Sequence, residues 1–449
     1  MASERLGVLE PPNRRGLPPT RFIDRVIVHY PGIELVADAD LSASSDPYLA
    51  DHLLDGDLRL PAVLGMEVFF QGKRFQRVLD YRRLAATSCV VEISAVPVNG
   101  WFSGCHPATL LLGDPGTRDA FMHAIQCCVP NATLLPAGIE RLYPAGPSAL
   151  GEQVTLHAAE RSRAGDTFTY DLEVRDVDGA VLERWEGLRL QAVRQTDGSG
   201  PWVPALLGPY LERQVAEFLP GSLRCAVEPN PSVLSRYADP RRGQTTVALS
   251  RMLERPVTVL HRGDGKPALM GEGTAISAAH GAGVTLVVGS ASRVSCDVEI
   301  VRERTAADWA GLLGPEPFAL AQLTCRERGE DFAVAATRAW SAVESLRKAG
   351  RVLPGPLTLD QGGRDGWALF RSGRSKIATF ATRLRGEPDQ VIFAIQAEGD
   401  VHESVLRIPA HRWFRGDQPG GQRLLRELRA MAGQVPRDVP ARARAGRAR

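Results

Sequence analysis

The sequence has neither an excess of one charge nor a long apolar segment. Its 54 Lys and Arg against 52 Asp and Glu leave a formal net charge of +2, which argues against general nucleic-acid binding as the main task. No apolar run approaches the roughly 20 residues needed to cross a bilayer. Residues 1–20 are rich in proline and arginine and lack the apolar core of a signal peptide. We therefore expect a cytoplasmic protein that acts on neither nucleic acid nor a membrane.

The cysteines form no C-x-x-C pair, and their number is odd. The seven are Cys89, Cys105, Cys127, Cys128, Cys225, Cys296 and Cys325. A disulfide framework or a cysteine-based zinc site would show regular, paired spacings. We expect reduced thiols.

At 449 residues the chain is long for one hydrophobic core, so two or three domains are expected. A Gly/Ser/Pro-rich break at Thr196–Pro201 marks the main boundary. The predicted segments are 1–20 as a disordered N-terminus, 21–195 as a strand-rich domain, 196–202 as a linker, 203–412 as a mixed α+β domain, and 413–449 as a helix followed by a basic disordered tail.

Hydrophobic periodicity gives the expected elements. Strands are expected at Ile27–Leu35, Val154–Ala159, Phe168–Val174, Val181–Ala192, Gly366–Phe370, Lys376–Arg383 and Gln390–Gln396. Helices are expected at Pro61–Gln71, Arg118–Cys128, Leu206–Phe218, Thr245–Leu253 and Asp331–Lys348.

Two short stretches of the second domain combine three carboxylates with a lysine. Asp297 and Glu299 close a β-rich run, and alternation along a strand puts both side chains on one face. Glu344 and Lys348 lie one turn apart on the expected helix 331–348. Such a set suits a hard divalent cation held against a pyrophosphate. The alternative is a solvated strand end beside an ordinary helix.

Four ordered motifs resemble the larger, pseudodimeric 4′-phosphopantetheinyl transferases. They are Gly265-Lys266-Pro267, the run Ile276–His280, Asp297-Val298-Glu299, and Trp340–Gly350 with its Glu344 and Lys348. The resemblance covers roughly residues 203–410. It implies an enzyme that uses Mg²⁺ and coenzyme A and moves the phosphopantetheine arm onto a serine of an acyl carrier protein.

The resemblance also implies roles for single residues. Asp297, Glu299 and Glu344 would bind the metal, Arg242, Lys266 and His280 the phosphates of coenzyme A, Lys348 the pyrophosphate, and Glu316 would orient or deprotonate the serine. Position 343 is valine where the family has its first motif lysine, which predicts a slowed enzyme. Trp340 and Leu346 are expected in the core, and His280 taken alone would be a hydrogen-bonded core histidine.

The first domain resembles the dehydratase domains of polyketide synthases, which are double hotdog folds. The resemblance rests on His52 with Gly56 and Pro61, on Asp119 with His123 one helical turn later, and on Leu135–Leu142. It implies His52 as the base and Asp119 as the acid in the dehydration of 3-hydroxyacyl thioesters. Alternatively, His52 is a core residue and Asp119 only charges the start of a helix. Double hotdog domains often dimerise, so a homodimer is expected by analogy.

Three further sequence segments are His29–Val36, Asp114–Gly116 and Ala124–Pro130. They resemble the C-terminal part of the iterative polyketide synthases that make enediyne cores, where a dehydratase precedes a phosphopantetheinyl transferase. The segment after Glu67 is shorter than in that family, so we expect an incomplete first hotdog. The rival hypothesis is a non-catalytic accessory protein that binds carrier protein within a polyketide assembly.

Overall fold

The computed structural model describes most of the chain between residues 74 and 399. The described ranges are 74–97, 113–146, 150–230, 240–253, 255–263, 265–270, 273–350 and 355–399, with the backbone of four short strands, β1 (Arg25–Tyr30), β2 (Glu34–Asp38), β3 (Leu53–Leu54) and β4 (Asp57–Leu58). The chain divides into Met1–Val401 and His402–Arg449, and every described residue belongs to the first unit. The expected N-terminal and C-terminal disordered segments and the helix at Pro61–Gln71 lie outside the described residues.

The prediction of a single strand at Ile27–Leu35 is wrong. Two antiparallel strands, β1 and β2, occupy this region and pair Tyr30 with Glu34. Pro31 and Gly32 stand between them, and proline cannot donate to a strand ladder.

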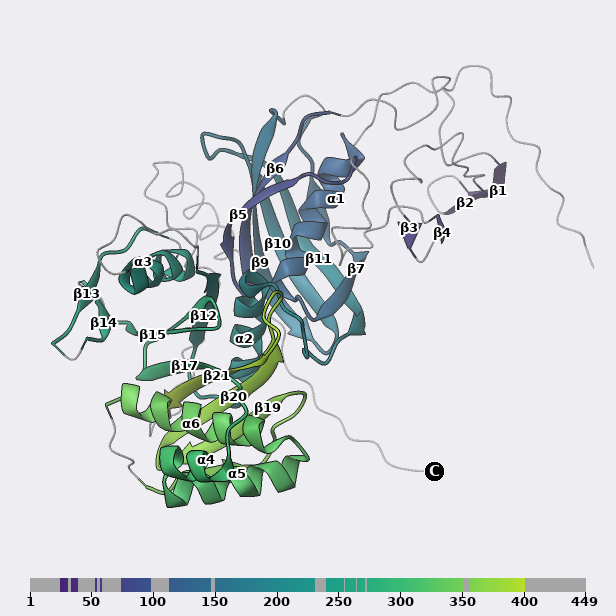
Figure 1. The fold of residues 1–449 in the computed structure, drawn as a ribbon. Helices are drawn as coiled ribbons and strands as arrows, with labels where there is room; N and C mark the ends of the chain where they lie inside the picture. The colour runs from purple at the N-terminus through teal and green to yellow at the C-terminus, as the bar shows by residue number, and fades with distance from the viewer. Residues whose placement is uncertain are drawn as a thin grey trace, which may run out of the picture. The chain divides into compact units, whose positions relative to one another are not determined.

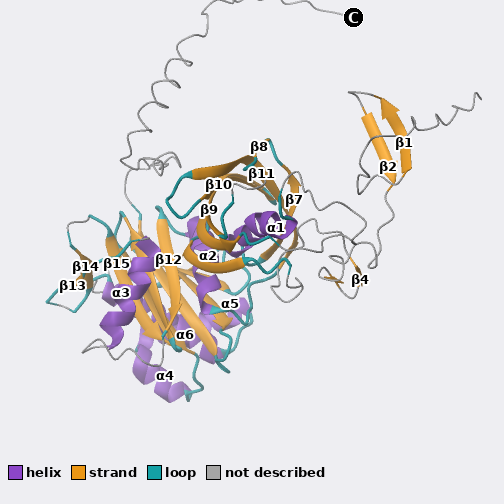
Figure 2. Cartoon of the chain, turned by 90° about the horizontal axis from the view of Figure 1, so that it is seen from above, coloured by secondary structure: helices purple, strands orange, loops and turns teal. Residues whose placement is uncertain are grey.

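A seven-stranded antiparallel sheet curls around one helix in the first domain (Figures 1 and 2). Its strands are β5 (Val78–Leu84), β6 (Ser88–Ser94), β7 (Ala132–Gly138), β8 (Arg141–Tyr143), β9 (Gln153–Ala164), β10 (Thr167–Arg175) and β11 (Val181–Gln195). The order is β5-β6-β9-β10-β11-β7, with β8 on β11. The described residues thus hold one hotdog-like unit, and those expected to form the other fall largely outside.

Helix α1 (Pro115–His123) fills this sheet. Asp114 caps it by accepting a hydrogen bond from the Thr117 amide at 2.9 Å, and Pro115 stands in its first turn, where a missing N–H costs nothing. The helix predicted over Arg118–Cys128 therefore starts earlier and tightens into the 3₁₀ segment η2 (Ala124–Cys128). Phe121 and Ile125 are fully buried against the inner face of the sheet. The curl of the sheet follows from wrapping this apolar helix.

His157 makes the stability of the first domain depend on pH. Burial on β9, with nearby Arg175 as a further cause, lowers the pKa of His157 to about 4. In the unfolded chain its pKa is about 6.5, so between these values the unfolded state binds the extra proton. The free energy of unfolding should then fall by roughly 1–2 kcal/mol as pH drops from 6.5 to 4. This value is smaller than the full pKa shift would give, because the partial exposure of His157 lets solvent screen its charge. Urea unfolding of His157→Gln should lack that part of the slope; an unchanged slope contradicts the assignment.

The segment predicted as a linker, 196–202, is packed rather than loose. Trp202 is 7% exposed, its indole donates to the Gly198 carbonyl at 2.8 Å, and its backbone pairs with that of Leu384. The Thr382 hydroxyl donates to the Ser199 carbonyl at 3.0 Å. The segment is therefore fixed to the second domain.

The second domain is a mixed α+β unit. Its elements are α2 (Pro204–Phe218), β12 (Leu223–Pro229), α3 (Pro240–Leu253), β13 (Val259–His261), β14 (Pro267–Leu269), β15 (Ala275–Gly281), β16 (Val284–Ser290), β17 (Val294–Ile300), α4 (Ala306–Leu313), α5 (Pro315–Arg328), α6 (Phe332–Lys348), β18 (Thr358–Asp360), β19 (Trp367–Ser372), β20 (Ser375–Arg383) and β21 (Gln390–Glu398). These agree with the helices and strands expected beyond residue 203.

The domain contains the small β13-β14 sheet and two larger sheets, each covered by a helix. In the first, β12-β16-β15, Leu249 of α3 packs against Val287. In the second, β17-β21-β20-β19-β18, Leu346 of α6 packs against Phe370 and Ile377, so its expected core position is confirmed. All pairings in both sheets are antiparallel.

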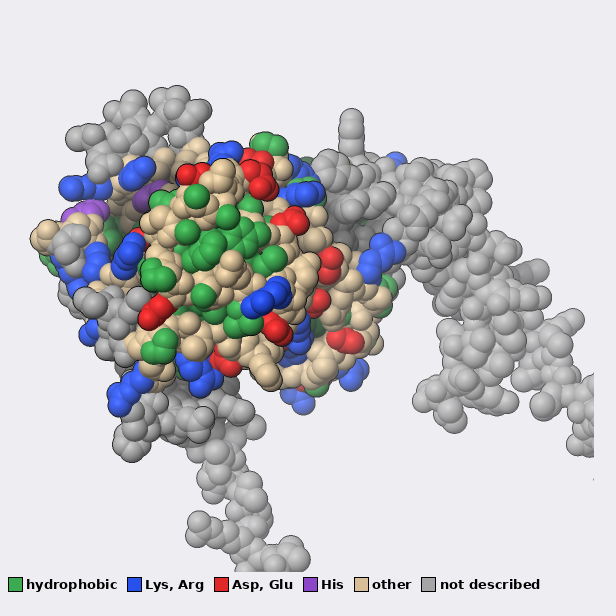
Figure 3. All heavy atoms as spheres, turned by 60° about the horizontal axis from the view of Figure 1, so that its bottom comes forward, with side chains coloured by type: hydrophobic (Ala, Val, Ile, Leu, Met, Phe, Trp, Pro, Cys, Tyr) green, Lys and Arg blue, Asp and Glu red, His purple; other side chains and the backbone are tan. Residues whose placement is uncertain are grey.

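Helices α4 and α5 cover α6 and leave apolar side chains at the surface. Leu312 of α4 and Leu323 of α5 are 42% and 38% exposed. The face turned forward from the bottom of Figure 1 shows apolar side chains gathered among charged ones (Figure 3). None of the helices in the described part of the chain combines the length and apolar character needed to span a membrane.

Candidate functional site

Strand β17 presents Asp297 and Glu299 to helix α6. Cys296 and Val298 point the other way, into the main core of the second domain. Asp297 and Glu299 both contact side chains of α6, as the period-two pattern predicted. The strand alternation therefore puts both carboxylates on the helix-facing side of the sheet.

Asp297 is held by the lysine of the expected helix motif. The Lys348 ammonium donates to Asp297 Oδ1 at 2.7 Å and to the Cys296 carbonyl at 3.2 Å. Asp297 is 5% exposed, whereas one third of the Lys348 side chain is accessible. The predicted proximity of Asp297 and Lys348 is thus present as a close ion pair.

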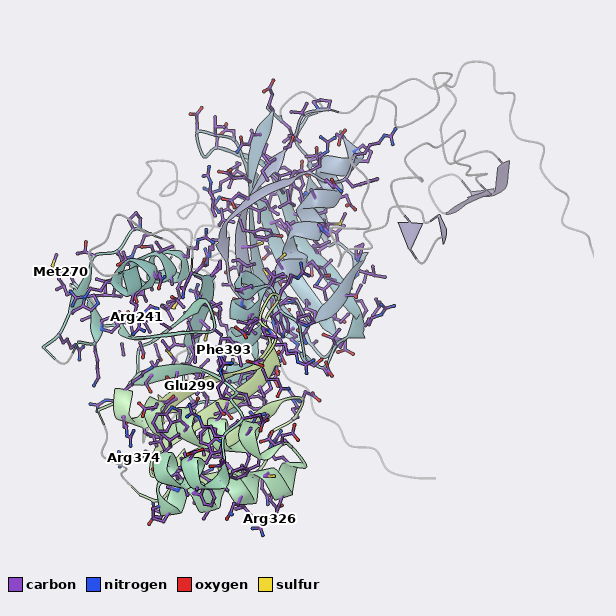
Figure 4. All side chains as sticks on the ribbon, in the orientation of Figure 1. Arg241, Met270, Glu299, Arg326, Arg374 and Phe393 are labelled. Atoms are coloured by element: carbon purple, nitrogen blue, oxygen red, sulfur yellow. The ribbon has the colours of Figure 1, made fainter. Side chains whose placement is uncertain are left out.

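The other two carboxylates are also bound by α6. The Trp340 indole donates to Glu299 Oε1 at 3.2 Å, at the place where β17 meets the helix (Figure 4). Arg347 donates to Glu344 Oε1 at 2.5 Å, and its guanidinium lies 5.9 Å from the Trp340 ring centre. Trp340 is half-buried and contacts the acidic side chains, so its assignment to the core alone was incomplete. Its position at the head of the helix motif was the available signal.

The carboxylates act on one another through space. Burial, and to a lesser extent the charge of Glu344, raises the pKa of Asp297, although Lys348 opposes the rise. Burial also raises the pKa of Glu299, with the Asp297 and Glu344 charges adding to it. Burial is the largest single influence on Lys348 and lowers its pKa, but the charge and hydrogen bond of Asp297, with Cys296 and Glu344, together outweigh burial, so that the pKa is raised. The three acids therefore share one electrostatic neighbourhood in which added positive charge is favourable.

Lys266 reaches the end of the same helix. Its Nζ lies 3.7 Å from the position that a Cβ would take on Gly350, two residues beyond Lys348. A tight turn places it, since the Gly265 amide donates to the Arg262 carbonyl at 2.9 Å and Gly265 has φ of +79°. The Gly-Lys-Pro motif and the end of the helix motif, about 80 residues apart in sequence, thus approach each other.

His280 is tied to α3 by hydroxyl groups. Its Nε2 lies 3.1 Å from Thr245 Oγ1, and its Nδ1 lies 2.9 Å from Thr285 Oγ1, which in turn donates to Asn230 Oδ1 at 2.6 Å. Because Thr285 gives its one hydroxyl proton to Asn230, it accepts from His280 Nδ1–H. Both nitrogens are engaged, in line with the hydrogen-bonded alternative. Arg242 is exposed one turn before Thr245, and its role toward phosphate stays a prediction.

The acidic group suits Mg²⁺ by chemistry but is not arranged as a ligand shell. Asp297 Oδ2 is buried and has no hydrogen bond of ordinary geometry, although the Ser341 hydroxyl is near enough to lower the pKa of Asp297; a buried carboxylate oxygen of this kind is one that a hard cation binds. No set of three or more Asp, Glu, His or Cys side chains within the described ranges is placed to hold a metal ion. The assignment of Asp297, Glu299 and Glu344 as ligands therefore remains a prediction.

Glu316 and Val343 lie apart from this contact network. Glu316 is exposed in the first turn of α5, and no hydrogen bond or ion pair joins it to Asp297, Glu299 or Glu344. Val343, one residue before Glu344, is 6% exposed and packs as an ordinary apolar side chain.

The predicted dehydratase acid lies inside the first domain. Asp119 is 5% exposed on α1, and His123 is 9% exposed one turn later. Asp114 caps α1, and Asp119 lies within the helix, so the alternative that Asp119 stands at the start of the helix is wrong. Arg118 is held by buried Glu183 at 2.8 Å, which fixes this end of the helix. His52 lies outside the described residues.

Comparison with known proteins places the first domain. Residues 62–200 match the family model of the polyketide synthase dehydratase N-terminal domain, a range that includes Asp119 and begins beyond His52. No curated protein matches the chain significantly.

Three solved structures illustrate the likeness. A trans-acyltransferase polyketide synthase enoyl-isomerase matches at 17% identity and a TM-score of 0.23, over 27% of this chain and 47% of its own. The dehydratase domain of RzxB from Pseudomonas fluorescens matches at 19% and 0.22, over 27% and 42%. The dehydratase domain of the CurJ module of curacin polyketide synthase matches at 16% and 0.22, over the same shares. The chain spans less than half of each. Residues 62–200 are therefore a dehydratase-like domain of the polyketide synthase type.

Proposed function

We propose that the second domain transfers 4′-phosphopantetheine from coenzyme A to a serine of an acyl carrier protein. The observation that carries the proposal is that two other motifs, Asp297-Val298-Glu299 and Gly265-Lys266-Pro267, both approach the helix motif of α6 and the residues that follow it. Lys348 contacts Asp297, Trp340 contacts Glu299, and Lys266 reaches Gly350. If β17 and α6 had only a structural role, their packing would not require Lys266, from a distant hairpin, beside Gly350.

The residues fit this reaction by their chemistry. The carrier serine oxygen forms a bond to the phosphorus of the pantetheine arm, the pyrophosphate P–O bond breaks, and adenosine 3′,5′-bisphosphate leaves. Lys266, Lys348 and Arg242 would bind phosphate oxygens, where ammonium and guanidinium donors give strong hydrogen bonds. Mg²⁺, when bound by Asp297, Glu299 and Glu344, supplies charge neutralisation at the phosphates. Glu316 is retained as the candidate that accepts the serine proton.

We further propose that the first domain acts on 3-hydroxyacyl thioesters borne by carrier protein, in a polyketide assembly of the enediyne type. Its dehydratase-like sequence and the position of Asp119 on the buried helix α1, one turn before His123, support this, because a carboxyl group inside the domain can act as a general acid. Asp119 would protonate the leaving hydroxyl, and His52 would take the proton beside the thioester carbonyl. Release of water from a 3-hydroxyacyl thioester, lost in Asp119→Asn, tests this part separately.

Intact mass spectrometry tests the transferase. The full chain is incubated with coenzyme A, Mg²⁺ and an apo carrier protein, and the carrier should gain the mass of one phosphopantetheine at its serine. The matched control is a carrier with that serine replaced by alanine. No mass gain across several carriers would exclude the transferase.

A second candidate is a non-catalytic accessory that binds carrier protein. The absence of a ready ligand shell within the described ranges, together with Val343, favours it. Stable carrier binding without any mass gain would identify this case.

Val343→Lys should accelerate transfer if the proposal holds. A lysine stem at this buried helix position can extend to the surface and bring an ammonium beside Glu344 and the phosphates. One charge-assisted contact is worth ~1.5–3 kcal/mol, so we expect a rate about 10- to 100-fold higher. Val343→Met, of similar length but uncharged, is the control. Equal rates for the lysine, methionine and parent proteins would contradict the role assigned to this position.

A further inference from the structure

Each acidic side chain of the candidate site already has a donor from α6. Lys348 binds Asp297, Trp340 binds Glu299, and Arg347 binds Glu344. Asp297 is the most deeply buried of the three acids, and its second oxygen has no hydrogen bond of ordinary geometry, although the Ser341 hydroxyl is near enough to lower the pKa of Asp297. The resting arrangement thus leaves one buried oxygen with no close hydrogen bond, beside an ammonium group.

We propose that Lys348 is an internal counter-ion that closes this site until a divalent cation arrives. In the resting protein its ammonium neutralises Asp297; when a cation occupies the acids, Lys348 leaves and becomes available to an anionic diphosphate. Divalent cation and diphosphate then bind cooperatively, because each favours the same position of one side chain. The inference rests on the proposed function only where it has Lys348 bind a diphosphate after leaving Asp297.

The location of Lys348 allows this movement. It is the last residue of α6, followed by Ala349 and by Gly350 at φ of +77°, so its flexible stem can turn without disturbing a helical turn beyond it. One third of the side chain is accessible, whereas 6% of the Asp297 side chain is. Lys266 at Gly350 is a second cation at this helix end. A second cation near this end of α6 adds to the attraction for an anion.

Mn²⁺ titration followed by electron paramagnetic resonance tests the counter-ion role on the full chain, without coenzyme A. Lys348→Met keeps the stem and removes the charge, so Mn²⁺ affinity should rise about 10-fold. Lys348→Arg keeps a cation and should bind Mn²⁺ as weakly as the parent. Lys376→Met, an exposed lysine on β20, is the control and should change nothing. Since Lys348→Met leaves Asp297 without its cation, added Mn²⁺ should raise its melting temperature more than that of the parent.

The cooperativity is measured by repeating the titration with coenzyme A. The parent should bind Mn²⁺ more tightly when coenzyme A is present, and Lys348→Met should lose most of that gain. Unchanged or weaker Mn²⁺ binding by Lys348→Met overturns the inference, as does Mn²⁺ binding that survives Asp297→Asn. If Lys348→Met tightens Mn²⁺ binding but no carrier ever gains mass, the counter-ion stands and the proposed transferase falls.

Discussion

Asp297→Asn is expected to reduce carrier loading at least 100-fold while leaving the protein folded. The substitution keeps the size of the side chain and its place beside Lys348, but removes the charge that a hard cation needs. Loss of outer-shell partners alone typically costs 10- to 100-fold at metal sites, so loss of a direct ligand should cost no less. The rate of mass gain on the apo carrier protein is the measurement.

The control for this prediction is Asp389→Asn. Asp389 is an exposed acid that pairs with Arg302 at 2.6 Å, and it lies just before β21, the strand that pairs with β17. Its neutralisation should leave the rate within a factor of about two, because exposed ion pairs contribute little. Equal losses for both variants, or full activity of Asp297→Asn, would mean that Asp297 is not a ligand.

The elements of the second domain could be predicted closely because their signals are local. The helix at 331–348 carries a strong apolar periodicity and is observed as Phe332–Lys348, and the strand 376–383 is observed as Ser375–Arg383. The acidic pair on β17 followed from alternation alone. Boundaries set by caps were less accurate: α1 begins at Pro115 because Asp114 caps it, three residues before the predicted start at Arg118.

What the sequence could not supply is the pairing of side chains across elements. Glu344 and Lys348 are one turn apart, yet Glu344 pairs with Arg347 and Lys348 turns to Asp297 on a strand 51 residues away. The choice depends on burial, since Asp297 is the acid least able to remain charged without a partner. Nor does sequence spacing reveal that Trp340 donates to Glu299. Such contacts are properties of packing, and spacing along one helix does not determine them.

The contact between α2 and the first domain was likewise absent from the sequence analysis, which predicted this helix but not what it packs against. Arg213 of α2 donates to Glu160 Oε2 at 2.7 Å and to the Ala86 carbonyl, and both charged side chains are 9% exposed. Glu212 accepts from the Ala86 amide at 3.3 Å and from the Cys225 amide at 2.9 Å. Arg213 and Glu212, which are adjacent on α2, thus bind the carbonyl and the amide of Ala86 in the first domain. Glu212 also binds β12 of the second domain.

Arg213→Met should therefore destabilise the protein strongly. Removing one partner of a buried ion pair leaves Glu160 charged and buried, which typically costs ~3–5 kcal/mol. Arg163→Met is a matched control, because both guanidinium groups lie over the Phe168 ring, at 5.2 and 5.1 Å, but the Arg163 side chain is 37% exposed and pairs with Glu217 at 3.5 Å. Its loss should cost under about 1 kcal/mol. Urea unfolding followed by circular dichroism measures both.

A double substitution separates the ion pair from the packing. Because the cost of Arg213→Met lies largely in the abandoned Glu160 charge, adding Glu160→Gln should recover part of the lost stability rather than add to the loss. In the parent, the Tyr170 hydroxyl donates to Glu160 Oε2 at 3.1 Å. The side-chain carbonyl of a glutamine at position 160 can accept the same hydrogen bond. If Arg213→Met costs no more than Arg163→Met, or if the two losses at 213 and 160 simply add, then the pair does not join α2 to the first domain in the way its burial implies.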